Sequence, residues 1–219
     1  YGAGRIHDSF VARFGAASSQ TSATAPSCTL LVQRINSAVF SDVPGLMANM
    51  ALVTAHLRAK AAARGPADIG RRALSLVPTR DGEPYMRLGD ACFRAYHFVE
   101  GSRSAAVGDL RALVDAARML GRFHQDVADL PAAKLTCPLP GFHDTVQRLR
   151  ALEQAAVLDA VGRAHEARAE LERIRSCASL AVDFAEALAR GDILLRVAHN
   201  DPKLDNALFD AETGEALCM

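Results

Sequence analysis

The sequence predicts an α+β protein whose first half is a small antiparallel sheet and whose second half is mainly helical. Apolar and β-branched segments alternate with turns up to residue 101, and one long helix interrupts them. Alanine- and arginine-rich helical patterns dominate afterwards. Hydrophobic residues make up 50% of the 219 residues, enough for a buried core. We therefore expect a β-rich part over residues 1–101 and a helical part over 102–219.

The β-rich part begins with a glycine turn and a strand within residues 1–15. The next residues, 16–27, are small and polar and predict a loop. Residues 28–36, "CTLLVQRIN", are apolar and β-branched and predict a second strand.

A helix is predicted over residues 41–65, where apolar side chains recur on one face and Gly65-Pro66 ends the pattern. The predicted buried face consists of Leu46, Met50, Val53 and Leu57. Residues 72–101 then predict antiparallel strands with turns at Asp81-Gly82 and Gly89-Asp90.

The helical part is predicted to start with a helix over residues 106–129. Its expected buried face is Leu110, Leu113, Ala117, Leu120 and Phe123. A loop at 130–141 precedes two or three helices within 142–190. After the break at Gly191-Asp192, the apolar segment "ILLRVA" predicts a strand over 193–198.

Composition excludes several functions. Lys and Arg total 25 and Asp and Glu total 25, so no net charge attracts nucleic acid or an acidic membrane. No apolar run approaches the roughly 18 residues of a membrane helix. We see no signal peptide and expect a cytoplasmic protein. The five cysteines form no C-x-x-C pair, and we interpret them as reduced, buried thiols.

The segment "AHNDPKLDNALFD", residues 198–210, concentrates polar side chains between two apolar segments. Asp201, Lys203 and Asn206 follow one another as D-x-K-x-x-N. Phosphoryl transfer needs a carboxylate to orient a hydroxyl, a cation near the transferred phosphoryl group and an oxygen ligand for Mg²⁺. These three residues are of the required types. The alternative is a solvated turn in which Asn and Asp bond their own backbone.

Several segments together resemble the aminoglycoside-phosphotransferase and choline-kinase-like branch of protein-kinase-like enzymes, and are most similar to the N-acetylhexosamine 1-kinase group. They are "GAGRIHDSF" (2–10), "LVQRINSAVFSDVPGLMANMALVTAHL" (31–57), "FRAYHFVEGSRS" (93–104), "LGRFHQDVADL" (120–130), "PGFHDTVQRL" (140–149) and "HNDPKLDNALFD" (199–210). The resemblance implies a two-lobed fold: a nucleotide-binding lobe over 1–101 and a helical lobe over 102–219. It implies ATP and Mg²⁺ as cofactors.

The resemblance also implies roles in the 198–210 segment. Asp201 corresponds to the catalytic base, Lys203 to the residue that steadies the γ-phosphate, and Asn206 to the Mg²⁺ ligand. His199 is expected to orient this segment through its ring nitrogens.

Residues of the first lobe are implied to bind the nucleotide. Gly2 and Gly4 correspond to the turn over the phosphates, although such a pair is also common in plain turns. Arg34 corresponds to the strand cation on the phosphates, or else it is an outward-facing cation. Residues 97–101, with Phe98 and Glu100, correspond to a hinge whose backbone pairs with adenine.

The substrate side is less defined. His143 and Asp144 are candidate substrate contacts, with packing or helix capping as the alternative. The resemblance implies transfer to the anomeric hydroxyl of an N-acetylhexosamine. Another small alcohol, such as an aminoglycoside or a choline-like compound, and a non-catalytic nucleotide-binding protein remain alternatives.

Two features depart from the family pattern. Helix 41–65 contains no Glu to pair with the strand cation, and its only acid is Asp42. The second metal carboxylate of the family follows the hairpin after the catalytic loop, and this chain stops at Met219. We therefore expect a chain truncated at its C-terminus, with an incomplete helical lobe and no catalysis of its own.

Overall fold

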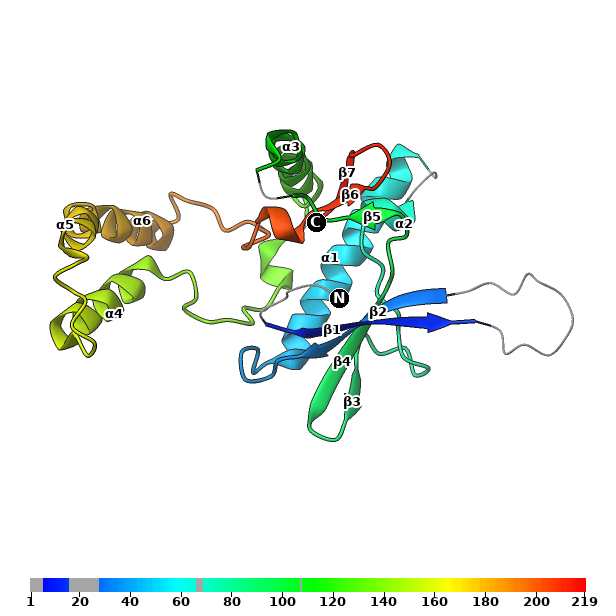
Figure 1. Cartoon of the computed structure of the whole chain (residues 1–219), viewed down its shortest axis with the longest axis horizontal. Helices are drawn as coiled ribbons and strands as arrows, with labels where there is room; N and C mark the ends of the chain where they lie inside the picture. Colours follow the sequence, from blue (N-terminus) through cyan, green and yellow to red (C-terminus); the bar gives the residue numbers. More distant parts are fainter. Residues whose placement is uncertain (1–5, 16–27, 66–68, 107) are drawn as a thin grey trace, which may run out of the picture. The chain divides into compact units, whose positions relative to one another are not determined.

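A computed structural model describes residues 6–15, 28–65, 69–106 and 108–219 and has an α+β fold with a small antiparallel sheet and several helices (Figure 1). Contacts within the chain define two compact units. The main unit combines Tyr1–Pro138 with Val197–Met219, and the helical unit spans Leu139–Arg196. These units are defined by contacts and divide the chain at residues 138 and 196. The boundary at residue 101 was predicted for functional lobes, and it remains a prediction.

A four-stranded antiparallel sheet forms one layer of the main unit, in the order β1-β2-β4-β3. The strands are β1 (Asp8–Phe14), β2 (Cys28–Ile35), β3 (Met86–Leu88) and β4 (Ala91–His97). The strands predicted within 1–15 and 28–36 are confirmed. The loop predicted at 16–27 lies outside the described residues.

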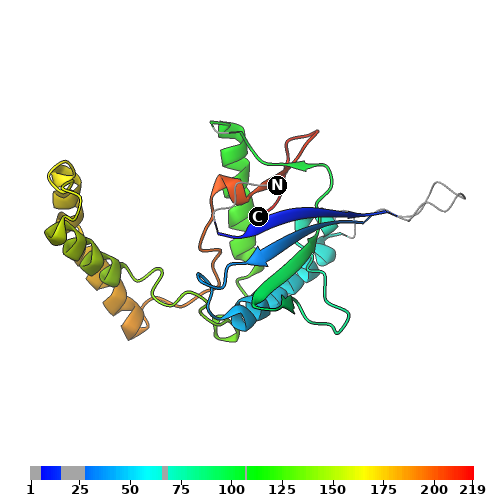
Figure 2. The same cartoon turned by 60° about the horizontal axis from the view of Figure 1, so that its bottom comes forward.

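The two faces of this sheet have different surroundings. Side chains alternate along each strand, so Ile35 and the directly opposite Cys92 share one face. Both are buried against helix α1 (Val43–Arg64), which lies on that face (Figure 2). Arg34 and its neighbour Phe93 therefore belong to the opposite face.

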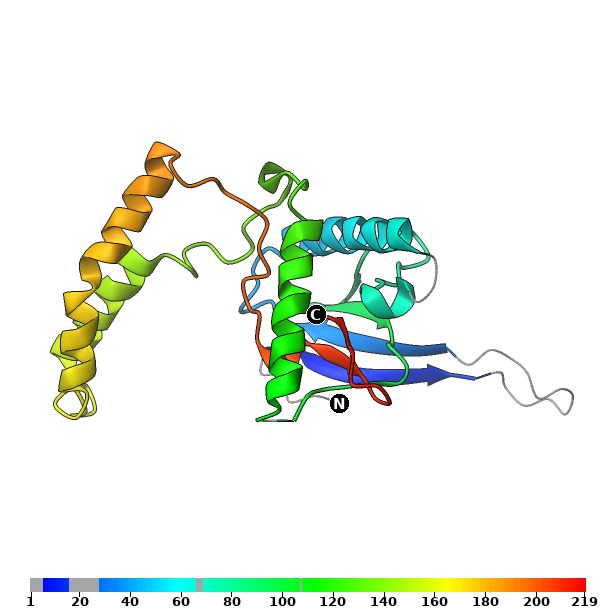
Figure 3. The ribbon, with the colours of Figure 1, turned by 90° about the horizontal axis from the view of Figure 1, so that it is seen from above.

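Helix α1 confirms the helix predicted over 41–65. Asp42 caps its start, because its carboxylate accepts a 2.9 Å hydrogen bond from the Gly45 amide. Gly65 ends it. Leu46 is buried as expected, and Met50 packs beside it. Figure 3 shows α1 along the sheet, with helix α3 (Leu110–Asp126) crossing near one end.

Residues 72–101 contain less sheet than predicted. A short helix, α2 (Ile69–Arg72), overlaps the start of this range. The following extended segment makes one isolated bridge, between Leu76 and Tyr96. The turn predicted at Gly89-Asp90 joins β3 to β4. The segment after α2 lies against the sheet without becoming a full strand.

A second, three-stranded sheet joins segments that are distant in the sequence. Its strands are β5 (Ser102–Arg103), β6 (Leu208–Asp210) and β7 (Ala216–Cys218), in that order. Strands β6 and β7 form a hairpin at the end of the chain, with Gly214 at a φ of +74° in its turn. Helix α3 covers this sheet through Ala112 and Ala116, which pack with Phe209.

The buried face predicted for the 106–129 helix is wrong in its first half. Leu110 is 75% exposed and Leu113 is 53% exposed, whereas Ala112 and Ala116 are buried. The alanines allow α3 to approach the β6–β7 hairpin closely, since they project no long side chain. The predicted Phe123 does lie partly buried, against Val127 and Leu130.

The helical unit confirms the helices predicted over 142–190. They are α4 (Thr145–Leu158), α5 (Arg168–Ser176) and α6 (Ala178–Arg190). Within residues 139–196, all of which the structure describes, only Ala181 is buried. Large apolar side chains such as Val157, Leu158 and Leu180 are exposed.

The strand predicted over 193–198 is wrong. Residues 193–199 have no regular secondary structure, and Leu194 and Leu195 are exposed. An apolar, β-prone segment becomes a strand only when another strand pairs with it. In the part of the chain that the structure describes, neither sheet contains these residues.

Two expectations from composition have structural counterparts. All five cysteines are thiols, as predicted, but only Cys92 and Cys218 are buried. Cys28, Cys137 and Cys177 are exposed, so the prediction of buried thiols fails for three of the five. Across the described residues, the helices lack the combination of length and apolar character needed to cross a bilayer.

Candidate functional site

The polar loop at residues 198–206 is anchored on both sides by buried apolar residues. Before it, Val197 packs in an apolar cluster with Val127 and Leu130. After it, Ala207 and Phe209 are completely buried against α3. A short 3₁₀ turn, η2 (Leu204–Asn206), closes the loop. The core therefore holds both ends while the polar side chains between them reach the surface.

The three residues predicted to carry phosphoryl transfer lie together in this loop. Lys203 Nζ is 3.0 Å from Asp201 Oδ2. Asn206 Nδ2 donates to the same Oδ2 at 3.0 Å and to the Asp201 carbonyl oxygen at 2.8 Å. Both side chains thus bind one oxygen of the carboxylate, and Oδ1 is the oxygen that can face an incoming hydroxyl.

The contacts on Asp201 also set its charge. The hydrogen bond from Lys203 lowers the pKa of the Asp201 carboxyl most, partial burial opposes this, and the amide of Asn206 lowers it further. Asp201 is therefore ionised at neutral pH, and water around its 59% exposed side chain also favours the charged form. A carboxylate with a lowered pKa is suited to orienting a hydroxyl by accepting a hydrogen bond, and it would hold a transferred proton only briefly.

The residues just before Asp201 adopt an uncommon arrangement. Asn200 has a φ of +66°, a left-handed conformation that Asn tolerates better than most residues. The ring of His199 packs edge-on against Phe123 at 5.6 Å. Its Nδ1 is buried and makes no hydrogen bond to the described residues. Burial lowers the pKa of His199, and the charge and backbone hydrogen bond of Asp201 oppose this, so the ring contacts the loop as a neutral group.

The oxygen atoms of Asn206 and Asp201 could provide some, but not all, of the ligands of one Mg²⁺ ion. Because the nitrogen of the Asn206 amide is bonded to Asp201, its oxygen is the atom available to a cation. Asp201 supplies the nearby carboxylate. Among the described residues, no cluster of three or more His, Cys, Asp or Glu side chains forms a ready metal site. The loop therefore offers Mg²⁺ an amide and one carboxylate, and phosphate oxygens and water would have to complete the coordination.

The predicted hinge lies in the main unit and leads directly into β5. The Phe98 amide donates to the Thr29 carbonyl at 3.0 Å, so this amide serves the sheet. Glu100 is exposed in the turn that follows. Because β5 pairs with β6, the hinge segment and the hairpin after the polar loop belong to one sheet.

Arg34 lies on the face of the sheet opposite α1. Its guanidinium is 3.8 Å from Asp8, and both side chains are more than half exposed. This arrangement matches the predicted alternative of an outward-facing strand cation, and it leaves the role in phosphate binding a prediction. A pair with Asp42 is not available to it, because the Asp42 carboxylate caps α1.

The cation that does face α1 is Arg94, which sequence reasoning missed. It is only 8% exposed. Its Nε donates to Gln33 Oε1 at 3.0 Å, and its Nη1 lies 2.7 Å from Met50 Sδ. Arg94 lies between Cys92 and Tyr96 on the same buried face of β4, and this two-residue spacing was the signal that could have identified it.

The remaining candidates come from the helical unit and from the start of the chain. Asp144 caps α4 by accepting a 2.9 Å bond from the Gln147 amide, which is the predicted capping alternative. His143 packs edge-on against Phe142 at 4.8 Å. Both belong to the helical unit. Gly2 and Gly4 lie outside the described residues.

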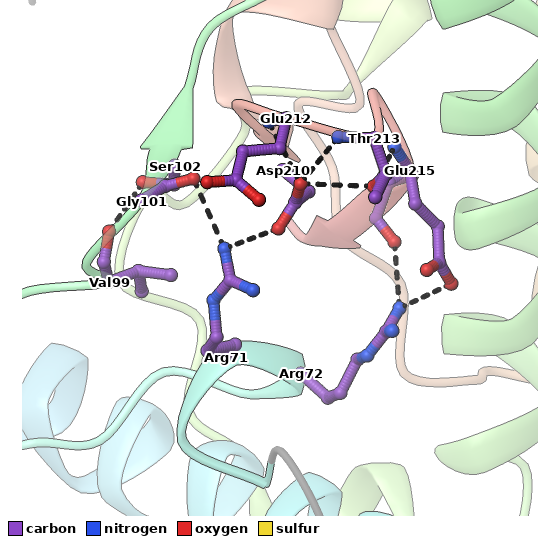
Figure 4. Close-up of polar contacts among 10 residues, drawn as sticks. Arg71, Arg72, Val99, Gly101, Ser102, Asp210, Glu212, Thr213 and Glu215 are labelled. Carbon is purple, nitrogen blue, oxygen red and sulfur yellow. Dashed lines mark hydrogen bonds and ion pairs between the residues drawn. The ribbon is translucent and has the colours of Figure 1, made fainter.

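Asp210, at the end of β6, is a second residue that the sequence did not single out. Its Oδ1 accepts bonds from the amides of Glu212 and Thr213 and from the Thr213 hydroxyl. Its Oδ2 lies 2.8 Å from Arg71 (Figure 4). The Thr213 amide, followed by Arg71, holds the pKa of this carboxyl well below its usual range. In the sequence, the only local indication of this role was an Asp followed by Thr213 and Gly214, residues that are typical of a turn.

A comparison with models of known protein families finds no family that matches this chain.

Proposed function

We propose that this protein is an ATP- and Mg²⁺-dependent kinase of a small hydroxylated compound, with a two-lobed protein-kinase-like fold. The observation that carries the proposal is the arrangement of Asp201, Lys203 and Asn206 around one carboxylate oxygen in a loop anchored by the core. Phosphoryl transfer depends on positioning and charge, and this loop contains the groups for both.

Asp201 would orient the attacking hydroxyl through its free carboxylate oxygen and accept its proton as the new bond to phosphorus forms. Lys203, which neutralises Asp201 at 3.0 Å, would turn toward the phosphoryl oxygens when a nucleotide is present. Its side chain is 54% exposed and can make that movement. The Asn206 amide would keep Asp201 in place through its nitrogen and present its oxygen to the cation.

ATP would supply the transferable phosphoryl group and leave as ADP, and Mg²⁺ would neutralise the charge that develops on the phosphate oxygens. The sugar class is supported by the resemblance of the segments at 31–57, 93–104, 140–149 and 199–210 to N-acetylhexosamine 1-kinases. The acceptor that we propose is the anomeric hydroxyl of an N-acetylhexosamine. An aminoglycoside or a choline-like alcohol is the next candidate, since the polar loop sets the reaction and not the acceptor.

The test is ADP release by the full-length protein with N-acetylglucosamine, N-acetylgalactosamine, kanamycin and choline as acceptors. Asp201→Asn preserves the shape of the side chain and can still accept a hydrogen bond, but it removes the base. We expect kcat to fall by about 10²-fold or more, with ATP affinity nearly unchanged.

The matched control is Asp205→Asn. It makes the same carboxylate-to-amide change at an exposed position of the same loop and leaves the contacts of Asp201 intact. Near-normal turnover by Asp201→Asn would remove this residue from the mechanism. ATP binding without turnover of any acceptor would favour a non-catalytic nucleotide-binding protein. Turnover of kanamycin or choline alone would refute the sugar class and keep the reaction type.

A further inference from the structure

Two adjacent arginines of α2, Arg71 and Arg72, reach the β6–β7 hairpin, and they do so differently (Figure 4). They come from the segment before β3, far in sequence from the hairpin. Both bind one carboxylate and one backbone carbonyl oxygen. The two carbonyl oxygens belong to different segments, so the two arginines stabilise different parts of the chain.

Arg71 joins two segments. Its Nη2 lies 2.8 Å from Asp210 Oδ2 at the end of β6 and donates to the carbonyl oxygen of Gly101 at 3.1 Å. The same Gly101 carbonyl accepts a 2.8 Å bond from the Ala211 amide. The turn at the end of the predicted hinge is thus bound by the backbone of the hairpin and by the side chain of Arg71.

Arg72 contacts the hairpin at β7. Its Nη1 is 2.9 Å from Glu215 Oε1 and donates to the Ala216 carbonyl oxygen at 3.0 Å. Both partners lie in or beside β7. The side chains of Arg71 and Arg72 are similarly accessible, at 33% and 31% exposed, so the pair forms a natural comparison.

Gly101 has a backbone conformation that favours glycine, and it lies close to Arg71. Gly101 has a φ of +64°, and a Cβ built on it would lie 3.4 Å from Arg71 Nη2. Just beside it, the Ser102 hydroxyl donates to the Val99 carbonyl oxygen at 2.6 Å. The backbone from Val99 to Ser102 is therefore fixed by side chains on both sides of the turn.

We propose that Arg71 is a positioning residue for the nucleotide: it fixes the 98–101 turn to the hairpin that follows the polar loop. This inference rests on the proposed function. Backbone groups can recognise a base only when their orientation is held in advance, because ordering them on binding costs affinity. The hairpin turn itself keeps its bonds to Asp210 Oδ1 without Arg71, and Gly101 keeps the bond from the Ala211 amide. Loss of Arg71 therefore loosens the hinge turn and leaves the polar loop in place.

The experiment compares Arg71→Gln, Arg71→Lys and Arg72→Gln in the full-length protein. Arg71→Gln is expected to raise KM for ATP about fivefold or more while kcat stays within about twofold, as for a lost charge-assisted hydrogen bond. Arg72→Gln is expected to leave KM unchanged. Arg71→Lys should restore most of the affinity, because one ammonium group can reach both oxygens.

Amide hydrogen exchange without nucleotide provides an independent measurement. Arg71→Gln should speed exchange in residues 98–103 and at Ala211, and Arg72→Gln should speed it only in 215–218. Should Arg71→Gln not fold, Asp210→Asn replaces it, since an amide oxygen can keep the turn bonds but loses the charge that attracts Arg71.

Equal rises in KM for the Arg71 and Arg72 variants would overturn the inference, as would failure of Arg71→Lys to restore affinity. If the unaltered protein uses no ATP, the proposed function falls and the role of Arg71 in nucleotide binding falls with it. In that case, the difference in amide hydrogen exchange between the Arg71 and Arg72 variants would still show which segment each arginine holds, because this measurement needs no nucleotide.

Discussion

The polar loop of the main unit and the helices of the helical unit are held by different interactions. The loop at 198–206 is exposed, yet Val197 on one side and Phe209 on the other are buried in two apolar clusters. In residues 139–196 only Ala181 is buried, and α4 and α5 are joined by an exposed pair between Glu153 and Arg175. Regular secondary structure alone therefore does not indicate which region is rigid, because burial of neighbouring residues decides it.

The largest expected difference between the two regions concerns apolar truncation. Phe209→Ala removes a completely buried ring and should lower the free energy of unfolding of the main unit by about 3–5 kcal/mol. Leu158→Ala in α4 removes a side chain that is 76% exposed and should change stability by less than about 0.5 kcal/mol. Urea unfolding of both variants measures the two free energies of unfolding. Similar losses would mean that Leu158 is buried in solution.

The next effect concerns the cation at the loop. Asn206→Ala removes the amide oxygen and should raise the Mg²⁺ concentration needed for half-maximal activity by about tenfold, since one hard ligand is lost. A magnesium titration of the two proteins, combined with urea unfolding to confirm equal stability, tests this. Superimposable titration curves would show that Asn206 does not bind the cation and only stabilises the loop through its hydrogen bonds to Asp201.

A smaller effect is expected from the backbone of the loop. Asn200→Val places a β-branched residue at a φ of +66° and should cost about 1–2 kcal/mol. Asn200→Gly is the matched control, because glycine adopts this conformation without a steric penalty. Thermal unfolding compares the two variants. A stable Asn200→Val protein would show that the loop can abandon the left-handed conformation.

The smallest effect is expected in the helical unit. Arg175 donates to Glu153 at 2.8 and 2.7 Å, and the pair is exposed to solvent. The bond from Arg175 lowers the pKa of Glu153, so the pair stabilises the fold above the ordinary pKa of a carboxyl group. That stabilisation is lost as the pH falls through the lowered pKa. Glu153→Gln should remove this acid dependence and be indistinguishable from the parent protein at high salt.

Local patterns predicted most of the helices and strands, and they drew attention to the polar side chains that the structure brings together. Asp42 before α1 and Gly65 after it mark a helix through interactions between residues three or four apart. The D-x-K-x-x-N spacing of Asp201, Lys203 and Asn206 likewise needs only one short turn to bring the side chains together. Near neighbours in the chain are sufficient for such features, and they are therefore readable in the sequence.

Tertiary structure decided the features that depend on distant segments. The hairpin selects the alanine face of α3 in place of Leu110 and Leu113, and the segment 193–198 stays irregular because no strand pairs with it in the described part of the chain. Only folding brings Arg71 to Asp210. Burial and pairing are properties of two surfaces that meet, and one local segment carries the pattern of only one of them.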